Sequence, residues 1–194
     1  MVTYTSAAMQ RVSGFTTRFG AVLATAAIVL GVLLSGCNTD PENASEVIEG
    51  QPIKLGDLLY NVQITRILNP DDPEDKAYLV GQQPPSSDEY YLGVFMRVIN
   101  EGSSSAQVAS DFKVVDTLGD TFDPIPSKSL FALKLGDTIH GGDELPELES
   151  TAANGPIEGS MVLFRIDGAA IQDRPLTLEI PSSDGSTGEV ELDI

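Results

Sequence analysis

The sequence predicts an all-β protein that folds as a two-sheet sandwich. Short segments with alternating apolar and polar residues recur after residue 57, each bounded by Gly, Pro, Asn, Asp or Ser, and no stretch there keeps helical spacing. Successive side chains of a strand point to opposite faces, so such segments suit a sheet with one buried face. Many short strands separated by turns are typical of a sandwich.

Two segments carry the strongest strand signal. Residues 58–68 (LLYNVQITRIL) alternate from Leu58 to Ile64, which predicts a strand with one face toward a core. Residues 90–99 (YYLGVFMRVI) are apolar on both alternating faces, so we expect a central strand that is buried on both sides. The other expected strands are shorter and end at turn residues: they are 111–116 with 121–123 as a hairpin, 129–135, 160–166, 176–180 and 189–194.

The connection between the two strongest strands is long. Residues 69–89 are rich in proline and acidic residues, with a brief apolar interruption at residues 77–80. Such a composition favours an exposed loop, with one short strand as the alternative at the interruption.

The beginning of the chain has the layout of a secretory signal. Residues 19–34 (FGAVLATAAIVLGVLL) are uncharged, and the only charged residues before them are Arg11 and Arg18. A basic flank followed by a short apolar run is typical of such signals. A spanning helix needs about 18 apolar residues or more, so a cleaved signal is favoured over a transmembrane helix.

The only cysteine of the chain follows this run. Leu34-Ser35-Gly36-Cys37 resembles the lipobox of bacterial lipoproteins, in which the cysteine is acylated and becomes the mature N-terminus. The resemblance implies a lipid anchor on Cys37 and a location on the extracytoplasmic side of the cell membrane, because two or more acyl chains hold a protein stably on a bilayer. The alternative is a chance cysteine in a cleavage region. With no second cysteine, disulfides cannot staple the domain.

These signals divide the chain into three parts. Residues 1–36 are the expected lipoprotein signal peptide, residues 37–52 a flexible acidic tether, and residues 53–194 the sandwich domain. Residues 38–50 (NTDPENASEVIEG) are polar, and they lack the apolar periodicity of a packed element.

The charge balance excludes one class of partner. The chain has 29 acidic residues against 11 basic ones, and its formal net charge is −18. Such a surface repels the phosphates of nucleic acids, so DNA and RNA binding are disfavoured. The acidic excess can also serve solubility alone.

Packing and turn motifs recur between residues 56 and 180. They are Tyr60-x-Val62, Val98-Ile99-Asn100-x-Gly102, Ser110-Asp111-Phe112 with Asp116, Gly119-Asp120, Leu135-Gly136 and Gly159-Ser160-x-Val162-x-Phe164. With these motifs the chain resembles the secreted immunoglobulin-like domains of unknown function found in Gram-positive lipoproteins, which are similar in fold to a mycobacterial secreted immunogenic protein. The resemblance implies an immunoglobulin-like sandwich and no particular chemistry. Residues 137–159 depart from it, because the family has only a few residues before its late strand.

The sequence offers little material for catalysis. His140 is the only histidine and lies in a glycine-rich stretch, whereas nucleophilic catalysis needs a base held beside its nucleophile. We therefore expect no enzyme activity and no cofactor. Carboxylates are plentiful, and calcium takes six to eight oxygen ligands from acidic loops. The weak metal candidates are Asp71, Asp72, Glu74 and Asp75 in one loop, and Asp137, Asp143, Glu144, Glu147 and Glu149 in the other.

Two functions remain open at this point. The first is a non-catalytic cell-envelope lipoprotein whose immunoglobulin-like domain binds an envelope or extracellular protein or supports the envelope. The alternative is an extracytoplasmic sensor or carrier that binds a cation such as calcium through its acidic loops. Because binding residues often lie on loops held by a rigid scaffold, we expect residues 137–159 to be the recognition element. Ile139, Leu145 and Leu148 would be its exposed apolar contacts, and a surface insertion without a role is the alternative.

Overall fold

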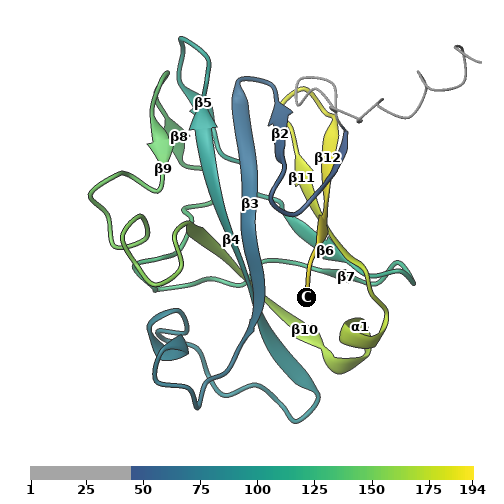
Figure 1. Ribbon diagram of the computed structural model, residues 1–194. Coiled ribbons are helices and arrows are strands. Elements are labelled where there is room, and N and C mark those ends of the chain that lie inside the picture. Colours follow the sequence, from purple (N-terminus) through teal and green to yellow (C-terminus); the bar gives the residue numbers. More distant parts are fainter. Residues whose placement is uncertain (1–44) are drawn as a thin grey trace, which may run out of the picture. The chain divides into compact units, whose positions relative to one another are not determined.

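A computed structural model describes residues 45–194 of the protein (Figure 1). The expected signal peptide, Cys37 and the first half of the expected tether lie outside the described residues. In the described part, no helix has both the length and the apolar character needed to cross a membrane.

Two antiparallel sheets form the body of the domain, as the sequence predicts. The first has the order β1 (Glu46–Ile48), β12 (Thr187–Leu192), β11 (Leu176–Pro181), β6 (Lys113–Val115) and β7 (Thr121–Phe122). The second has the order β10 (Ser160–Asp167), β4 (Glu89–Asn100), β3 (Leu58–Leu68) and β2 (Pro52–Leu55), and β9 (Glu144–Leu145) pairs with the end of β4. A small third sheet joins β5 (Ala106–Gln107) to β8 (Thr138–Ile139). Among the strands of residues 45–194, only β1 and β12 pair in parallel.

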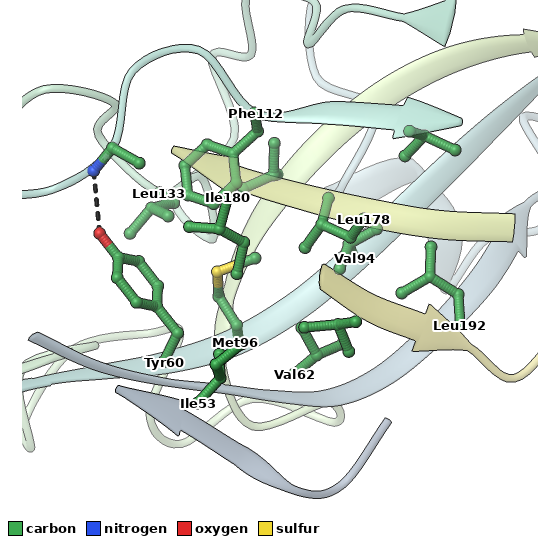
Figure 2. Packing of buried hydrophobic residues seen from close by; sticks show 14 of the residues in the cluster. Ile53, Tyr60, Val62, Val94, Met96, Phe112, Leu133, Leu178, Ile180 and Leu192 are labelled. Atoms are coloured by element: carbon green, nitrogen blue, oxygen red, sulfur yellow. Dashed lines mark hydrogen bonds between the residues drawn. The ribbon is translucent and has the colours of Figure 1, made fainter. Parts of the chain in front are cut away.

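The main core lies between the two large sheets. Alternate residues of β3 and β4 point inward and meet alternate residues of β11 and β12 (Figure 2). The fully buried members that Figure 2 labels include Val62, Val94, Leu178 and Ile180. Burying one such side chain stabilises the fold by about 1.5–3 kcal/mol. The Tyr60 hydroxyl accepts a hydrogen bond from the Ala109 backbone N–H at 2.9 Å, so the one polar group in this view has its partner.

A second apolar cluster covers the outer face of the second sheet. Tyr91 and Phe95 point outward from β4, and Tyr78 and Phe131 from two loops pack onto them. The Tyr78 and Phe95 rings meet edge to face with centroids 5.1 Å apart, an arrangement that aromatic pairs prefer. The expected burial of residues 90–99 on both faces is therefore confirmed along most of β4.

The alternation of β3 is broken at its middle. Its pairing with β4 shifts between Val62 and Ile64, which marks a β-bulge. An extra residue reverses the inward and outward sides of everything that follows. Ile64, expected on the core face, is 41% exposed, and Thr65 is buried instead.

Two segments differ from the strands expected of them. Residues 77–80, where a short strand was the alternative to an exposed loop, form no strand. The 3₁₀ helix η1 (Asp75–Ala77) ends at the first of them, and Tyr78 and Leu79 are buried in the outer apolar cluster. Residues 129–135 form turns and a single bridge between Ala132 and Met161, in which the Met161 N–H donates to the Phe131 carbonyl and the Leu133 N–H donates to the Met161 carbonyl.

The sandwich also begins earlier than residue 53. β1 lies within the segment expected to be a tether and adds an edge to the first sheet, with Val47 buried and its two neighbours exposed. The Glu49 carboxylate then accepts hydrogen bonds from the backbone N–H groups of Thr65 and Asp193 at 3.1 and 3.2 Å. Three residues, of which only Val47 is buried, are too short a pattern to reveal a strand.

One short helix was also absent from the expected elements. Helix α1 (Gly168–Gln172) follows β10 directly. Its N-cap is Asp167, whose carboxylate accepts a hydrogen bond from the Ala170 N–H at 3.0 Å, as aspartate does at helix starts.

Candidate functional site

Residues 137–149 are attached to the end of β4 by a buried asparagine. Asn100 is fully buried, and its side-chain amide donates to the carbonyl oxygens of Ile139 at 2.9 Å and Ser104 at 2.8 Å. Its side-chain oxygen accepts from the Gly102 N–H at 2.9 Å. Since each buried polar group is expensive to leave unpaired, this residue fixes the position of two loops at once.

Backbone hydrogen bonds also attach residues 137–149 to the end of β4. The Asn100 N–H donates to the Asp143 carbonyl, and the Gly142 N–H donates to the Asn100 carbonyl, before β9 pairs with Val98 and Ile99. A side chain at Gly141 would lie 2.6 Å from the Ser103 carbonyl carbon, so only glycine permits this close approach. The segment is thus an extension of the sandwich.

A surface groove runs along this segment, with a cavity volume of about 680 Å³. Its apolar lining includes Ile99, Leu145 and Leu148, and its acidic lining consists of Asp143, Glu144, Glu147 and Glu149. We call it the acidic groove. Arg97 donates a hydrogen bond to Glu144 and neutralises that carboxylate. The other three carboxylates form no ion pair within residues 45–194.

The three residues expected as exposed contacts fall into three environments. Leu148 is 74% exposed, and Leu145 is partly buried against the main core while it lines the groove. Ile139 is only 3% exposed, so the expectation of an exposed contact is wrong there. The pairing of β8 with β5 turns its side chain inward, and a two-residue strand gives no periodicity that would show this beforehand.

Four of the acidic residues considered for calcium line the groove, but the described candidates form no group that could hold a metal. Asp75 is buried and accepts hydrogen bonds from Arg66 at 2.7 Å and from the Asn69 N–H at 2.8 Å. Asp72 caps the Glu74 N–H, and Asp137 caps the Thr138 N–H, so these carboxylates serve loop structure. Among the described residues, no three His, Cys, Asp or Glu side chains are grouped to hold a metal. Calcium binding therefore remains a prediction without a preformed site in this part of the chain.

The structure brings one polar pair together that the sequence did not reveal. The Ser105 hydroxyl lies 2.9 Å from Nδ1 of His140, which lines the acidic groove. The two residues are 35 positions apart, and no spacing motif connects them. Both are exposed, and within residues 45–194 no carboxylate hydrogen-bonds to the imidazole. A third group that orients the base, the usual companion of a nucleophile and its base, is thus missing from this part of the chain.

Fold and groove together define a β-sandwich protein with a loop-built acidic groove at one end of its second sheet. No family model matches the chain, and no curated protein matches it.

Solved structures of similar architecture exist. MPT63, a secreted protein from Mycobacterium tuberculosis, has 12% identity and a TM-score of 0.49, covering 76% of this chain and 97% of its own. An uncharacterised β-sandwich protein from Clostridium difficile has 12% identity and a TM-score of 0.47, covering 78% and 96%. The yjhA protein from Bacillus subtilis has 17% identity and a TM-score of 0.44, covering 76% and 99%. Identities and scores this low define neither activity nor ligand.

Proposed function

We propose that this protein is a non-catalytic lipoprotein of the cell envelope, held on the extracytoplasmic side of the membrane through Cys37, whose sandwich binds a protein partner. The acidic groove is the single observation that carries the binding role. It combines an exposed apolar side chain and unpaired carboxylates on a segment fixed to the body of the domain.

Leu148 supports a contact role for the groove. It lies between Glu147 and Glu149 and is among the most exposed large apolar side chains of residues 45–194. Hydrogen bonds fix the backbone of the turn that carries Leu148: the side-chain amide of Asn154 donates to the Leu148 carbonyl at 2.8 Å and to the Ser150 carbonyl at 3.0 Å. A contact residue held in place loses little conformational entropy on binding, which favours affinity.

The anchoring role is supported by the sequence. The uncharged run that ends at Leu34, the small residues after it and the only cysteine of the chain occur together. Acylation at Cys37 would place the sandwich outside the membrane, where a groove on its surface meets envelope and extracellular proteins.

The non-catalytic role is supported by the environment of His140. Its contact with Ser105 is exposed to water. General base catalysis works best where the base is oriented and water is excluded. A hydroxyl and an imidazole that share a loop surface suit hydrogen bonding to a partner better.

A matched pair of variants tests the binding role. Leu148 and Leu118 are both 74% exposed, and Leu118 lies in the turn between β6 and β7 of the other sheet. Tagged full-length chains carrying Leu148→Asp or Leu118→Asp are recovered from membranes in a non-ionic detergent, and the co-purified proteins are quantified. We expect Leu148→Asp to lower recovery of a specific partner about tenfold or more, because a carboxylate buried at a contact is costly. Equal recovery with both variants would refute the groove as the binding site.

A further inference from the structure

We propose that the acidic groove takes an extended segment of a protein partner in which lysine or arginine residues alternate with apolar ones. This inference rests on the proposed binding function and adds the chemistry of the ligand.

The charges of the groove favour a cationic ligand. Asp143, Glu147 and Glu149 are exposed and have no ion pair within residues 45–194. The formal charge of the whole chain is −18, so the surrounding field also attracts cations and repels anions. Phosphate backbones and anionic lipid headgroups are therefore poor occupants.

The chain itself shows how one groove carboxylate receives a cation. Arg97 extends from β4 and donates from its guanidinium to Glu144, which lines the groove. A charge-assisted hydrogen bond of this type is stronger than a neutral one. The neighbouring carboxylates are exposed to solvent and have no such donor. A lysine or arginine of the partner would supply it.

The apolar part of the groove favours a peptide over a free cation. Leu145 and Ile99 line the groove beside the carboxylates, and Leu148 stands between two glutamates in sequence. Side chains of an extended peptide alternate in direction, so apolar residues can meet Leu148 while basic residues reach Glu147 and Glu149. A metal ion would leave these apolar contacts unused, and no three acidic side chains of the described residues are grouped for one.

Synthetic peptides test this chemistry with the full-length chain in non-ionic detergent micelles. The probe is a short fluorescein-labelled peptide of alternating lysine and valine. Two further peptides replace each lysine by glutamate or each valine by serine. Binding is followed by fluorescence anisotropy, with protein-free micelles as the baseline, at low and at physiological ionic strength.

Charge-reversal variants locate the binding. E147K/E149K changes two groove carboxylates, and D71K/E74K makes the same change of net charge at two exposed residues of the first acidic loop. We expect the lysine–valine peptide to bind, the glutamate peptide to show no binding, and the serine peptide to bind more weakly. E147K/E149K should weaken binding about tenfold or more, and D71K/E74K less than about threefold, because contact charges act locally while distant ones are screened.

Three outcomes would overturn the proposal. Equal weakening of peptide binding by both charge reversals would show that the peptide responds only to the net charge of the protein. Stronger binding of the serine peptide would refute the apolar contact in the groove. Absence of binding by the lysine–valine peptide would refute a basic ligand. The proposed function fails separately: it falls if Leu148→Asp leaves partner recovery unchanged. If that variant abolishes recovery while the lysine–valine peptide does not bind, the binding function stands and the basic ligand is refuted.

Discussion

Phe95 joins the central strand to the outer apolar cluster. Its side chain is fully buried, and its ring packs against Tyr78 from the loop that covers the second sheet. Replacing Phe95 with alanine should lower the free energy of unfolding by about 3–5 kcal/mol, the usual loss for a buried aromatic residue. Urea unfolding measures this loss. Tyr90→Ala is the control on the same strand, because Tyr90 is 40% exposed, and it should cost less than about 1 kcal/mol. A comparably small loss for Phe95→Ala would place Phe95 outside the core.

Tyr60 makes the stability of the fold depend on pH in the alkaline range. Burial raises the pKa of its phenol, and the hydrogen bond from Ala109 opposes this to a smaller extent. A phenol whose pKa is raised on folding keeps its proton longer in the native state, so its stabilising effect is complete below the ordinary value of about 10 and is lost as the pH rises beyond it. We expect Tyr60→Phe to lower stability at pH 7 by about 1 kcal/mol, since it leaves the Ala109 N–H unpaired.

Tyr60→Phe should also lose less stability at alkaline pH than the unchanged protein does. Unfolding free energies measured between neutral pH and about pH 11 should therefore converge for Tyr60→Phe and the unchanged chain. A parallel decline in both proteins would contradict this. Tyr78, whose pKa is also raised chiefly by burial, accounts for a remaining slope.

At the scale of elements, the long strands and the hairpin of β6 and β7 could be predicted, whereas the short strands β1, β2, β5, β8 and β9 could not. β3 and β4 carry enough alternating apolar residues for their type and ends to follow from sequence. The bulge that exposes Ile64 depends on pairing with β4, which the local pattern does not contain. The 3₁₀ helix before Tyr78 begins at Asp75, which forms an ion pair with Arg66, nine residues away in the chain.

The candidate site shows the same division. The position of the loop and the exposure of Leu148 followed from composition. The burial of Ile139 required the pairing of β8 with β5. The contact between Ser105 and His140 required the folded arrangement of two loops, which Asn100 fixes through hydrogen bonds invisible in the sequence.

The loop at residues 137–159 is part of the packing, which changes what its removal should do. Ile139 belongs to the main core and Ala152 to the outer cluster, while β9 pairs with β4. Replacing residues 137–159 with a short turn should therefore lower the melting temperature markedly, since losing the Ile139 side chain alone costs about 2–5 kcal/mol. Differential scanning calorimetry measures this change, and Leu148→Asp serves as the control. Because Leu148 is exposed, that variant should stay within about 2 °C of the unchanged protein. An equally stable shortened chain would show that the loop is dispensable for folding.

For the whole molecule, the proposed anchor on Cys37 would determine where the sandwich works. If Cys37 carries acyl chains, replacing it with alanine should move the protein from the detergent phase to the aqueous phase in a phase-partition experiment, because two or more chains are needed for stable membrane binding. Mass spectrometry of the N-terminal peptide provides the control by showing the acyl mass only on the unchanged protein. A Cys37→Ala variant that remains membrane-bound would contradict the lipoprotein assignment.

The central claim, that the acidic groove is where a partner binds, is tested most directly by site-specific photo-crosslinking in intact cells. A photoreactive amino acid is placed at position 148 or, as the matched control, at position 118, which has the same exposure of 74% in the other sheet. Illumination should produce a discrete crosslinked protein from position 148 and none from position 118. Adducts of equal yield from both positions, or an adduct from position 118 alone, would contradict the claim.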